Sequence, residues 1–390
     1  MARPLRIAVI GAGIGGMAAA AALHQRGFEV VVYERSSELG EVGAGLQLGP
    51  NAVKVLHGLG IEDKLRPLAA EPTNIVSVAW DDARLRYREA LKEISIARYG
   101  ARYLTAHRAD LHRLLLELVP ASGVHLNARC EAVTAQGKVA AARFADGREI
   151  EADVIIGADG IHSAVRESVF GSAPARFTQQ IAWRAMIPIE EVPTQIGPGN
   201  SVHIEGDEYV GWIGPNGHVI CYPIRGGKTY NLFIGHVSEE WVEESWTAPS
   251  TVQEILAAHE GWNEALLGML SKVENVYKWG IYDRDPLPAW TAGAVTLVGD
   301  AAHPMMPTLA QGAAITLEDS YAVARCLDGQ RDDPVAALRT YEAERLPRAR
   351  AVQLQARVQF ENNRMVPPPP PLSRDWIFEH DATVGPKVAA

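Results

Sequence analysis

A glycine-rich turn near the start of the sequence has the residue types that bind a nucleotide pyrophosphate. Gly11, Gly13 and Gly16 follow a short apolar run, and glycine lets the backbone turn sharply and approach an anion closely. A helix is expected directly after the turn, with free N–H groups pointing at the same place. Glu34 follows the next apolar run and can accept hydrogen bonds from a ribose diol. The motif predicts a site for NAD or for the ADP half of FAD and does not distinguish them.

Two later segments repeat the arrangement of an apolar strand, an acidic residue and a helix. Residues 153–166 read DVIIGADGIHSAVR, and Asp159 follows the strand. Residues 299–304 read GDAAHP, and Asp300 follows the strand predicted over 295–298. Ligands of doubly wound sheets bind at the carboxyl ends of the strands, where both aspartates are expected. Capping of the following helix is an additional role open to each aspartate.

These three motifs, in this order, resemble the class A flavoprotein monooxygenases, the single-component FAD-dependent aromatic hydroxylases. The resemblance extends from Arg6 to about residue 350 and implies FAD as the cofactor. Because no second glycine-rich nucleotide turn follows a strand, NADH or NADPH is expected as a transient co-substrate. By resemblance, the cofactor-binding residues are Gly11, Gly13, Gly16, Glu34, Arg35, Arg108, Asp159, Asp300, Gly312 and Ala313.

The resemblance also implies the reaction and its site residues. NAD(P)H reduces FAD, O2 adds at flavin C4a, and the terminal oxygen of the hydroperoxide is transferred to an electron-rich ring carbon. Removing the proton of a phenol makes the ring a better nucleophile, and a histidine of near-neutral pKa suits that base. His218 matches the active-site histidine, and Tyr222 lies on the same face of the predicted strand. Gln47, Pro304 and Met305 are expected to wall the substrate pocket.

Different segments of the sequence resemble different groups within the family. Residues 40–51 (GEVGAGLQLGPN) and 213–227 (IGPNGHVICYPIRGG) resemble the 3-hydroxybenzoate 6-hydroxylases and, slightly less, the salicylate hydroxylases. Residues 283–317 and the region of Trp376 resemble the 6-hydroxynicotinate 3-monooxygenases. Gln47 replaces a histidine usual in the last group, and Pro307 replaces a glutamine usual in the first. All three imply a small hydroxylated aromatic carboxylate, while the exact substrate and any release of CO2 stay open.

Other candidate residues have plainer interpretations. His303 is interpreted as structural or flavin-supporting, and Arg184 as part of an ion pair, with a substrate carboxylate as its alternative partner. His107 and His112 flank a helix start and are interpreted as ordinary helix residues. Two further hypotheses stay open, an NAD-dependent dehydrogenase and an FAD-binding protein that no longer hydroxylates.

Composition and charge indicate the class of partner and the cellular compartment. The formal net charge is −10, which disfavours nucleic-acid binding. Three widely spaced cysteines indicate a reducing compartment and give no metal site. The uncharged stretch over 7–23 superficially resembles a signal peptide, but the four glycines over 11–16 match a tight turn better. We therefore expect a cytoplasmic protein without a membrane span, whose partners are an aromatic acid and O2. A homodimer is a common arrangement in this family and is the expected oligomer.

The predicted fold positions these residues at strand ends. We expect an α/β chain with a Rossmann-like FAD-binding domain over 1–176, completed by residues 285–365 with long helices. A mostly antiparallel substrate-binding sheet is inserted over 177–284, where tryptophan, tyrosine and glycine are frequent. Residues 366–390 form a C-terminal arm with a stiff proline-rich segment over 367–371, interpreted as a packing arm.

Overall fold

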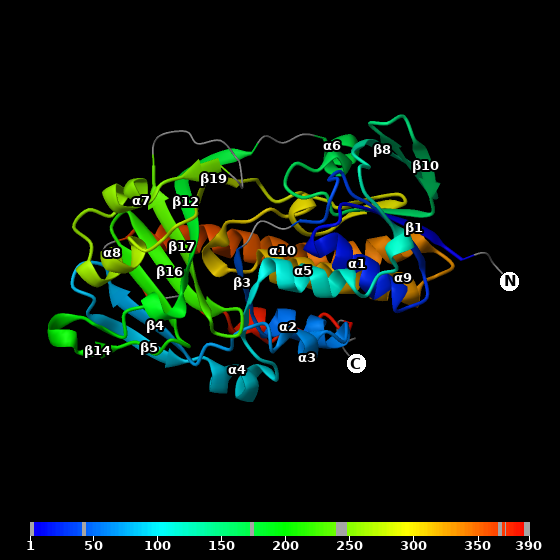
Figure 1. The fold of residues 1–390 in the computed structure, drawn as a ribbon. Helices are drawn as coiled ribbons and strands as arrows, with labels where there is room; N and C mark the ends of the chain where they lie inside the picture. Colours follow the sequence, from blue (N-terminus) through cyan, green and yellow to red (C-terminus); the bar gives the residue numbers. More distant parts are fainter. Residues whose placement is uncertain are drawn as a thin grey trace.

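The computed structural model of the chain describes residues 4–40, 44–171, 175–238, 248–365, 369–370 and 372–385. Two large sheets lie at opposite ends of an elongated molecule, with helices packed along and between them (Figure 1). Within these ranges, none of the helices is both long and apolar enough to cross a membrane.

The first sheet has six strands and is built from widely separated parts of the chain. Its order is β20-β21-β11-β1-β2-β7, and every pair is parallel except β20 with β21. The strands are β1 (Arg6–Ile10), β2 (Glu29–Tyr33), β7 (Val124–His125), β11 (Val154–Gly157), β20 (Thr291–Ala292) and β21 (Val295–Leu297). Their near-continuous apolar runs, such as IAVI in β1, suit strands that are buried on both faces.

The second sheet has eight strands in the order β18-β19-β12-β17-β16-β15-β4-β5. Its pairs are antiparallel except β15 with β4. The strands are β4 (Asn74–Ala79), β5 (Leu85–Ala90), β12 (Arg176–Pro188), β15 (Tyr209–Gly214), β16 (Gly217–Ile224), β17 (Thr229–Val237), β18 (Ala248–Ser250) and β19 (Val276–Asp283). The sheet therefore includes two strands that precede residue 177, and the domain boundaries given above stay predictions.

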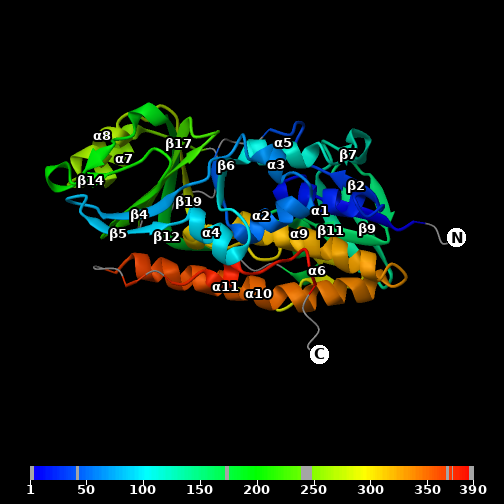
Figure 2. The ribbon, with the colours of Figure 1, turned by 90° about the horizontal axis from the view of Figure 1, so that it is seen from below.

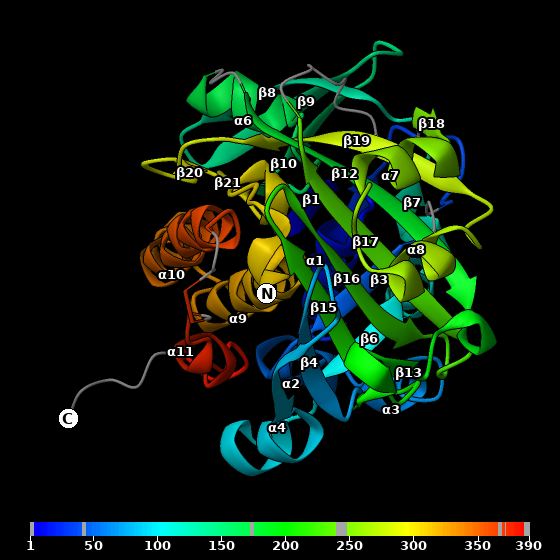
Figure 3. The ribbon, with the colours of Figure 1, turned by 90° about the vertical axis from the view of Figure 1, so that its left-hand side faces the viewer.

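The eight-stranded sheet has one apolar face and one face turned toward the first sheet. On the outer face, Val219, Leu232 and Ile234 form a core with residues of α7 (Val252–Ala258) and α8 (Glu264–Leu270). Figure 3 shows α7 and α8 on this side, with α9 (Gly312–Gly329) and α10 (Pro334–Asn363) on the other. Strand alternation therefore directs every second side chain of β15, β16 and β17 inward.

Helices cover the first sheet. Helix α1 (Ile14–His24) contacts both α5 (Arg108–Leu116) and α9, and α10 packs along α9. Figure 2 shows α10 running along much of the long axis of the molecule, with the short helix α11 (Asp375–Phe378) beside it. The remaining helices of at least four residues are α2 (Pro50–Gly58), α3 (Glu62–Leu65), α4 (Lys92–Tyr99) and α6 (Ala164–Phe170).

The smaller pieces complete the architecture. A three-stranded antiparallel sheet contains β8 (Cys130–Gln136), β9 (Val139–Phe144) and β10 (Glu149–Ala152). Two ribbons pair β3 (Gly45–Leu48) with β6 (Leu104–His107), and β13 (Gln195–Ile196) with β14 (Val202–His203). The 3-10 turns are η1 (Ala121–Gly123), η2 (Ile189–Glu191), η3 (Pro198–Asn200), η4 (Gly299–Ala301) and η5 (Pro307–Leu309).

The predicted fold class is confirmed: a Rossmann-like parallel sheet, an inserted and mostly antiparallel sheet, and C-terminal helices. The stretch over 7–23 forms β1 and α1, as the glycine pattern indicated. Asn51 is a residue type that suits a helix N-cap, but Gly49 is the N-cap of α2. The Asn51 amide is instead fully buried and bonds to Gln311 and Glu318, so a tertiary contact replaces the cap.

Candidate active site

A cavity of about 640 Å³ lies between the two sheets. One wall comes from the turn after β1, from the end of β21 and from the N-terminus of α9, and the other from the inner face of the eight-stranded sheet. Of the residues predicted from sequence, nine line it: Gly13, Gln47, Arg108, His218, Tyr222, Asp300, Met305, Gly312 and Ala313. Six lie outside its lining: Gly11, Gly16, Glu34, Arg35, Asp159 and Pro304.

The glycines of the first turn have distinct physical reasons. Gly11 has φ +102°, and a Cβ on it would lie 2.5 Å from the carbonyl oxygen of Ala158. A Cβ on Gly16 would lie 1.8 Å from the carbonyl oxygen of Gly11, so helix and turn touch through backbone. Gly13 has no neighbour within 4 Å of an added Cβ, and it is the N-cap of α1 without a side-chain cap. Two glycines therefore shape the turn, and the third leaves space at an uncapped helix end for an anion.

Polar contacts hold the turn in place. The Glu34 carboxylate accepts the backbone N–H of Ala12 at 2.7 Å and that of Ser36 at 2.9 Å. The His112 ring contacts the carbonyl oxygen of Ala12 at 2.6 Å from the buried side of α5. His112 is thus a positioning residue for the turn, a role that its place in a helical pattern did not reveal. Arg35 lies beside Glu34 in the chain and is exposed.

The second and third motifs meet at the carboxyl ends of β11 and β21. Asp159 accepts the Ser163 hydroxyl and the backbone N–H of Val165, so it has the capping role named above. Arg166 donates to the carbonyl oxygens of Ile161 at 2.5 Å and Ala301 at 3.0 Å, and so joins the two motifs.

Asp300 is the acid of the third motif that faces the cavity. The protein packed around the cavity desolvates its carboxyl and raises its pKa, an effect that His303, Arg108 and Arg166 oppose. Asp300 is thus positioned to accept hydrogen bonds from hydroxyl groups of a ligand chain.

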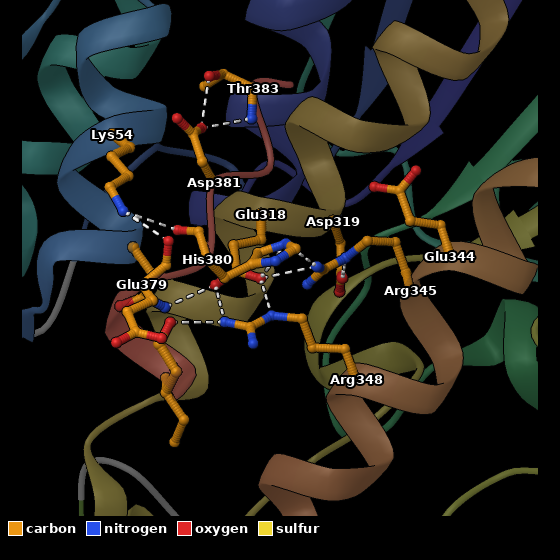
Figure 4. Close-up of polar contacts among 12 residues, drawn as sticks. Lys54, Glu318, Asp319, Glu344, Arg345, Arg348, Glu379, His380, Asp381 and Thr383 are labelled. Carbon is orange, nitrogen blue, oxygen red and sulfur yellow. Dashed lines mark hydrogen bonds and ion pairs between the residues drawn. The ribbon is translucent and has the colours of Figure 1, made fainter. Parts of the chain in front are cut away.

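The N-terminus of α9 is positioned by a buried polar network. Gly312 and Ala313 begin the helix and line the cavity, and no side chain caps it. The Gln311 amide oxygen accepts from Asn51 at 3.0 Å, and Asn51 also donates to Glu318 at 2.6 Å. Arg345 and Arg348 neutralise Glu318 at 2.7 Å each (Figure 4). Because Glu318 and Arg345 are fully buried, this network fixes the loop that presents free N–H groups to the cavity.

The strands of the large sheet align their cavity residues in rows. Arg184, Phe233, Ile220, Gly211, Ser77 and Tyr87 are register partners across six adjacent strands, and all six line the cavity. His218 lies in the row on one side and Tyr222 in the row on the other. His218, Ile220 and Tyr222 thus share the cavity face, as strand alternation requires.

His218 is buried, with 6 % of its surface exposed, and stacks on Phe233 with ring centroids 5.6 Å apart. Burial, with a smaller effect of His259, lowers the pKa of His218 to about 4. The near-neutral value expected from sequence does not hold without a ligand, because the apolar surroundings favour the uncharged ring. At neutral pH the ring is therefore uncharged and able to accept a proton.

Tyr222 lies at the other end of the cavity face of the eight-stranded sheet, beside other tyrosines. It stacks on Tyr209 with centroids 6.1 Å apart and an interplanar angle of 3°. Gln47 lines the cavity with Tyr222 and accepts the Tyr103 hydroxyl at 2.6 Å. Burial raises the pKa of Tyr222 well above its usual value, so its hydroxyl stays protonated and donates.

Of the remaining candidate residues, some line the cavity and others pack behind it. Met305 lines the cavity, whereas Pro304 lies behind it and accepts a hydrogen bond from Gln353 at 2.8 Å. His303 is buried against Asp319, consistent with a structural role. Arg184, interpreted from sequence as an ion-pair residue, lines the cavity and lies 4.2 Å above the Trp279 ring.

The lining of the cavity is basic although the chain is acidic. Its cationic side chains are Arg86, Arg108, Arg184 and Arg374, and Asp300 is the one carboxylate among the described residues that line it. Burial and the nearby Arg108 lower the pKa of Arg184 to about 9, so the guanidinium still carries its charge at neutral pH. The cavity therefore attracts anions, as a pyrophosphate or an aromatic carboxylate requires.

The residues present fit FAD. The turn at Gly13 leaves open space at an uncapped helix end, Asp300 faces the cavity, and a second uncapped helix end begins at Gly312. Sequence reasoning from local motifs found these groups. It missed Tyr209, Asn231 and Arg374, which line the cavity through strand register or from the C-terminal segment.

Comparison with known proteins identifies the class. Residues 5–356 match the FAD binding domain family. The chain is 41 % identical to 3-amino-4-hydroxybenzoate 2-monooxygenase PtmB3 of Streptomyces platensis, over 90 % of this chain and 87 % of that protein. It is 36 % identical to 6-hydroxynicotinate 3-monooxygenase of Bordetella bronchiseptica, over 98 % and 97 %, and 35 % identical to 3-hydroxybenzoate 6-hydroxylase 1 of Aquipseudomonas alcaligenes, over 90 % and 87 %.

Solved structures agree. A salicylate hydroxylase substrate complex matches with a TM-score of 0.82 and 26 % identity, covering 99 % of each chain. Klebsiella pneumoniae HpxO complexed with FAD and uric acid matches with a TM-score of 0.82 and 27 % identity, covering 92 % of this chain and 89 % of that one.

The chain belongs to the FAD-binding monooxygenase family, and the resemblance predicted from its motifs is confirmed. FAD, rather than NAD, is the cofactor of this fold. The sequence had not singled out the 3-amino-4-hydroxybenzoate group, which shares the higher identity.

Proposed function

We propose that the protein is an NAD(P)H- and O2-dependent hydroxylase of a small hydroxylated aromatic carboxylate. One observation carries the proposal: a single basic cavity is lined both by the cofactor motifs and by His218 and Tyr222 on the opposite sheet. The three named relatives act on hydroxylated aromatic or pyridine acids, which supports the substrate class.

FAD, when bound, supplies reduction by NAD(P)H and activation of O2. The proposed binding groups are the free N–H groups after Gly13 for the pyrophosphate, Glu34 for the ribose, and Asp300 for the ribityl chain. The N-terminus of α9 at Gly312 and Ala313 favours negative charge beside it, because its N–H groups are uncapped. Arg108 neutralises part of the anionic cofactor.

His218 is the proposed base for the phenol of the substrate. Its ring is uncharged at neutral pH and can accept the phenolic proton. A phenolate formed beside it then stabilises the imidazolium and raises the pKa of His218 from its value in the ligand-free cavity. Tyr222 keeps its proton, and its hydroxyl donates a hydrogen bond that orients the aromatic ring of the substrate.

A second candidate is decarboxylative hydroxylation of 6-hydroxynicotinate or salicylate. It is favoured by the 6-hydroxynicotinate 3-monooxygenase relative, whose match covers 98 % of this chain. Both candidates use the same cavity and base and differ in the ring position presented for oxygen transfer.

The deciding experiment is NAD(P)H oxidation by the purified holoenzyme with a panel of acids. The panel contains 3-hydroxybenzoate, salicylate, 4-hydroxybenzoate, 3-amino-4-hydroxybenzoate and 6-hydroxynicotinate, with organic product and CO2 measured for each. Stimulated oxidation with a matching hydroxylated product supports the proposal and names the substrate. Bound FAD without stimulation or product from any acid overturns it. Comparing NADH with NADPH in the same assay identifies the electron donor.

We also infer a cytoplasmic location, supported by three free cysteines, of which Cys221 and Cys326 are buried. The homodimer stays a prediction, and sedimentation of the holoenzyme checks it. The division into a domain over 1–176 and 285–365 and an insert over 177–284 is likewise proposed.

A further inference from the structure

The C-terminal segment forms part of the cavity wall. Pro369, Pro370, Leu372 and Arg374 all line the cavity. Of the proline-rich stretch 367–371, only residues 369 and 370 lie within the described ranges. The packing arm expected from sequence thus contributes side chains to the site itself, and one of them carries a charge.

The backbone on both sides of Arg374 is held firmly. The Arg374 carbonyl accepts the N–H groups of Ile377 and Phe378 at 3.0 Å each and so starts α11. Before it, the Ser373 carbonyl accepts from the Gln355 amide of α10 at 3.1 Å. The ammonium of Lys54 contacts three successive carbonyl oxygens from Phe378 onward, at 3.0 to 3.2 Å (Figure 4).

The backbone near Arg374 is also held by the buried polar network around Glu318 that positions the N-terminus of α9. Arg348 is paired with Glu318 and also donates to the carbonyl of Ile377 at 2.9 Å. The Phe378 ring packs edge-on against Tyr103, with centroids 5.9 Å apart. Arg374 is therefore presented to the cavity from a preorganised backbone, which lowers the entropy cost of using it to bind a ligand.

Arg374 lines the cavity near several tyrosines. Its guanidinium lies 5.3 Å from the centre of the Phe378 ring, which packs against Tyr103, and the Tyr103 hydroxyl donates to Gln47 at 2.6 Å. Burial raises the pKa of Tyr87, Tyr103 and Tyr209, and the Arg374 guanidinium opposes that rise in each of them. Its charge thus reaches tyrosines from three different strands or loops around one end of the cavity.

The other arginines of the cavity have different surroundings. On the cofactor side, the charge of Arg108 lowers the pKa of Asp300 and of Arg184. Arg184 also stacks on Trp279. Arg86 is exposed on the edge strand β5. Arg374 is the cavity arginine whose guanidinium charge acts on Tyr103 and Tyr209, whereas Arg184 acts on Tyr222. A carboxylate accepts such a planar fork of N–H donors with good geometry, and hydroxyl donors can satisfy its remaining lone pairs.

We propose that Arg374 is the specificity-determining residue that binds the carboxylate of the aromatic substrate, with the tyrosine hydroxyls around it completing the site. This inference rests on the proposed function. It assigns the two ends of the substrate, with the carboxylate toward Arg374 and Tyr222 and the phenolic hydroxyl toward His218.

The test compares an acid with its uncharged analogue of the same shape. The holoenzyme and its Arg374→Gln and Arg374→Lys variants are assayed with 3-hydroxybenzoate and with 3-hydroxybenzamide. Loss of a charged hydrogen bond predicts a KM for the acid raised about tenfold to a hundredfold in Arg374→Gln, with the KM for the amide unchanged. Arg374→Lys should recover part of the loss, because it keeps the charge but not the planar fork.

The matched control is Arg364→Gln, which removes an exposed guanidinium that stacks on Phe360 and does not line the cavity. It should leave both KM values as in the parent. Retained FAD and an unchanged melting temperature establish that each variant is folded. Equal shifts for acid and amide in Arg374→Gln, or no shift for either, overturn the proposal.

A binding readout separates this proposal from the proposed function. Benzoate is titrated into the parent and the Arg374→Gln holoenzyme, and the flavin absorption spectrum is followed. A dissociation constant raised about tenfold or more in the variant supports the carboxylate site even if no acid of the panel is hydroxylated. Equal dissociation constants, or no binding of benzoate by the parent, refute it whatever the turnover experiments show.

Discussion

Substituting Gly235→Ala tests the role of His218 without changing any group that takes part in chemistry. Gly235 lies on β17 opposite His218, and a Cβ there would lie 2.6 Å from Cε1 and 2.9 Å from Nε2 of the ring. Ordinary contacts of this kind begin at 3.4 Å, so the imidazole must move by about 0.8 Å. Overpacking of this size costs about 1–3 kcal/mol, which a domain of this size can tolerate.

We expect the variant to bind FAD normally and to form product about a hundredfold more slowly, because misplacing a reacting group by about 1 Å has this effect. The assay measures hydroxylated product and NAD(P)H oxidation at saturating acid, together with bound flavin. Gly268→Ala on α8 is the control, because an added Cβ there has no neighbour within 4 Å and Gly268 does not line the cavity. It should form product at the parent rate. Product formation by flavin-loaded Gly235→Ala at the parent rate would refute the assignment of His218 as the base.

Three further predictions concern the cofactor and stability. Asp300→Ala should lower the fraction of purified protein that retains FAD, since it removes the carboxylate facing the cavity, and full flavin content would contradict this role. Arg345→Met should lower the free energy of unfolding by about 3 kcal/mol, measured from urea denaturation, because it removes the buried guanidinium shared by Glu318 and Asp319. Arg348 then stays as the arginine partner of Glu318, and His303 as the partner of Asp319. An unchanged midpoint would count against that reasoning. Burial lowers the pKa of His218, His259 and His380 to about 4, so the unfolded chain takes up these protons first and stability is lost as pH falls from about 6.5 to about 4. One such histidine contributes about 3 kcal/mol, so a melting temperature independent of pH over this range would contradict the assignment.

The cofactor side was readable from sequence because its constraints are local. Gly11 and Gly16 are glycines since backbone atoms of the turn and of the neighbouring strand end lie where a Cβ would be. The acid after β21 follows its strand closely, so its place at a parallel strand end needed no tertiary information. Strand alternation likewise predicted that His218 and Tyr222 share a face.

What the sequence could not reveal depends on register between distant strands. Arg184 enters the cavity because β12 pairs with β17 at Phe233, in the same row as Ile220. Arg374 enters it because helices distant in sequence fix the backbone around it. The low pKa of His218 is also a tertiary property, since it arises from burial on all sides once the sheet and its neighbours have closed.

The order of the strands in the first sheet constrains how the chain can fold. Residue 7 pairs with residue 154, and residue 155 pairs with residue 295, while most of the eight-stranded sheet lies between the last two in sequence. Closing such long loops is slow because the entropy must be lost before the pairing rewards it. Strand β21 pairs with β11 across the long segment between residues 155 and 295, and the third cofactor motif directly follows it. The site that retains FAD therefore depends on this long-range pairing, and a chain in which β21 is unpaired exposes the edge of β11.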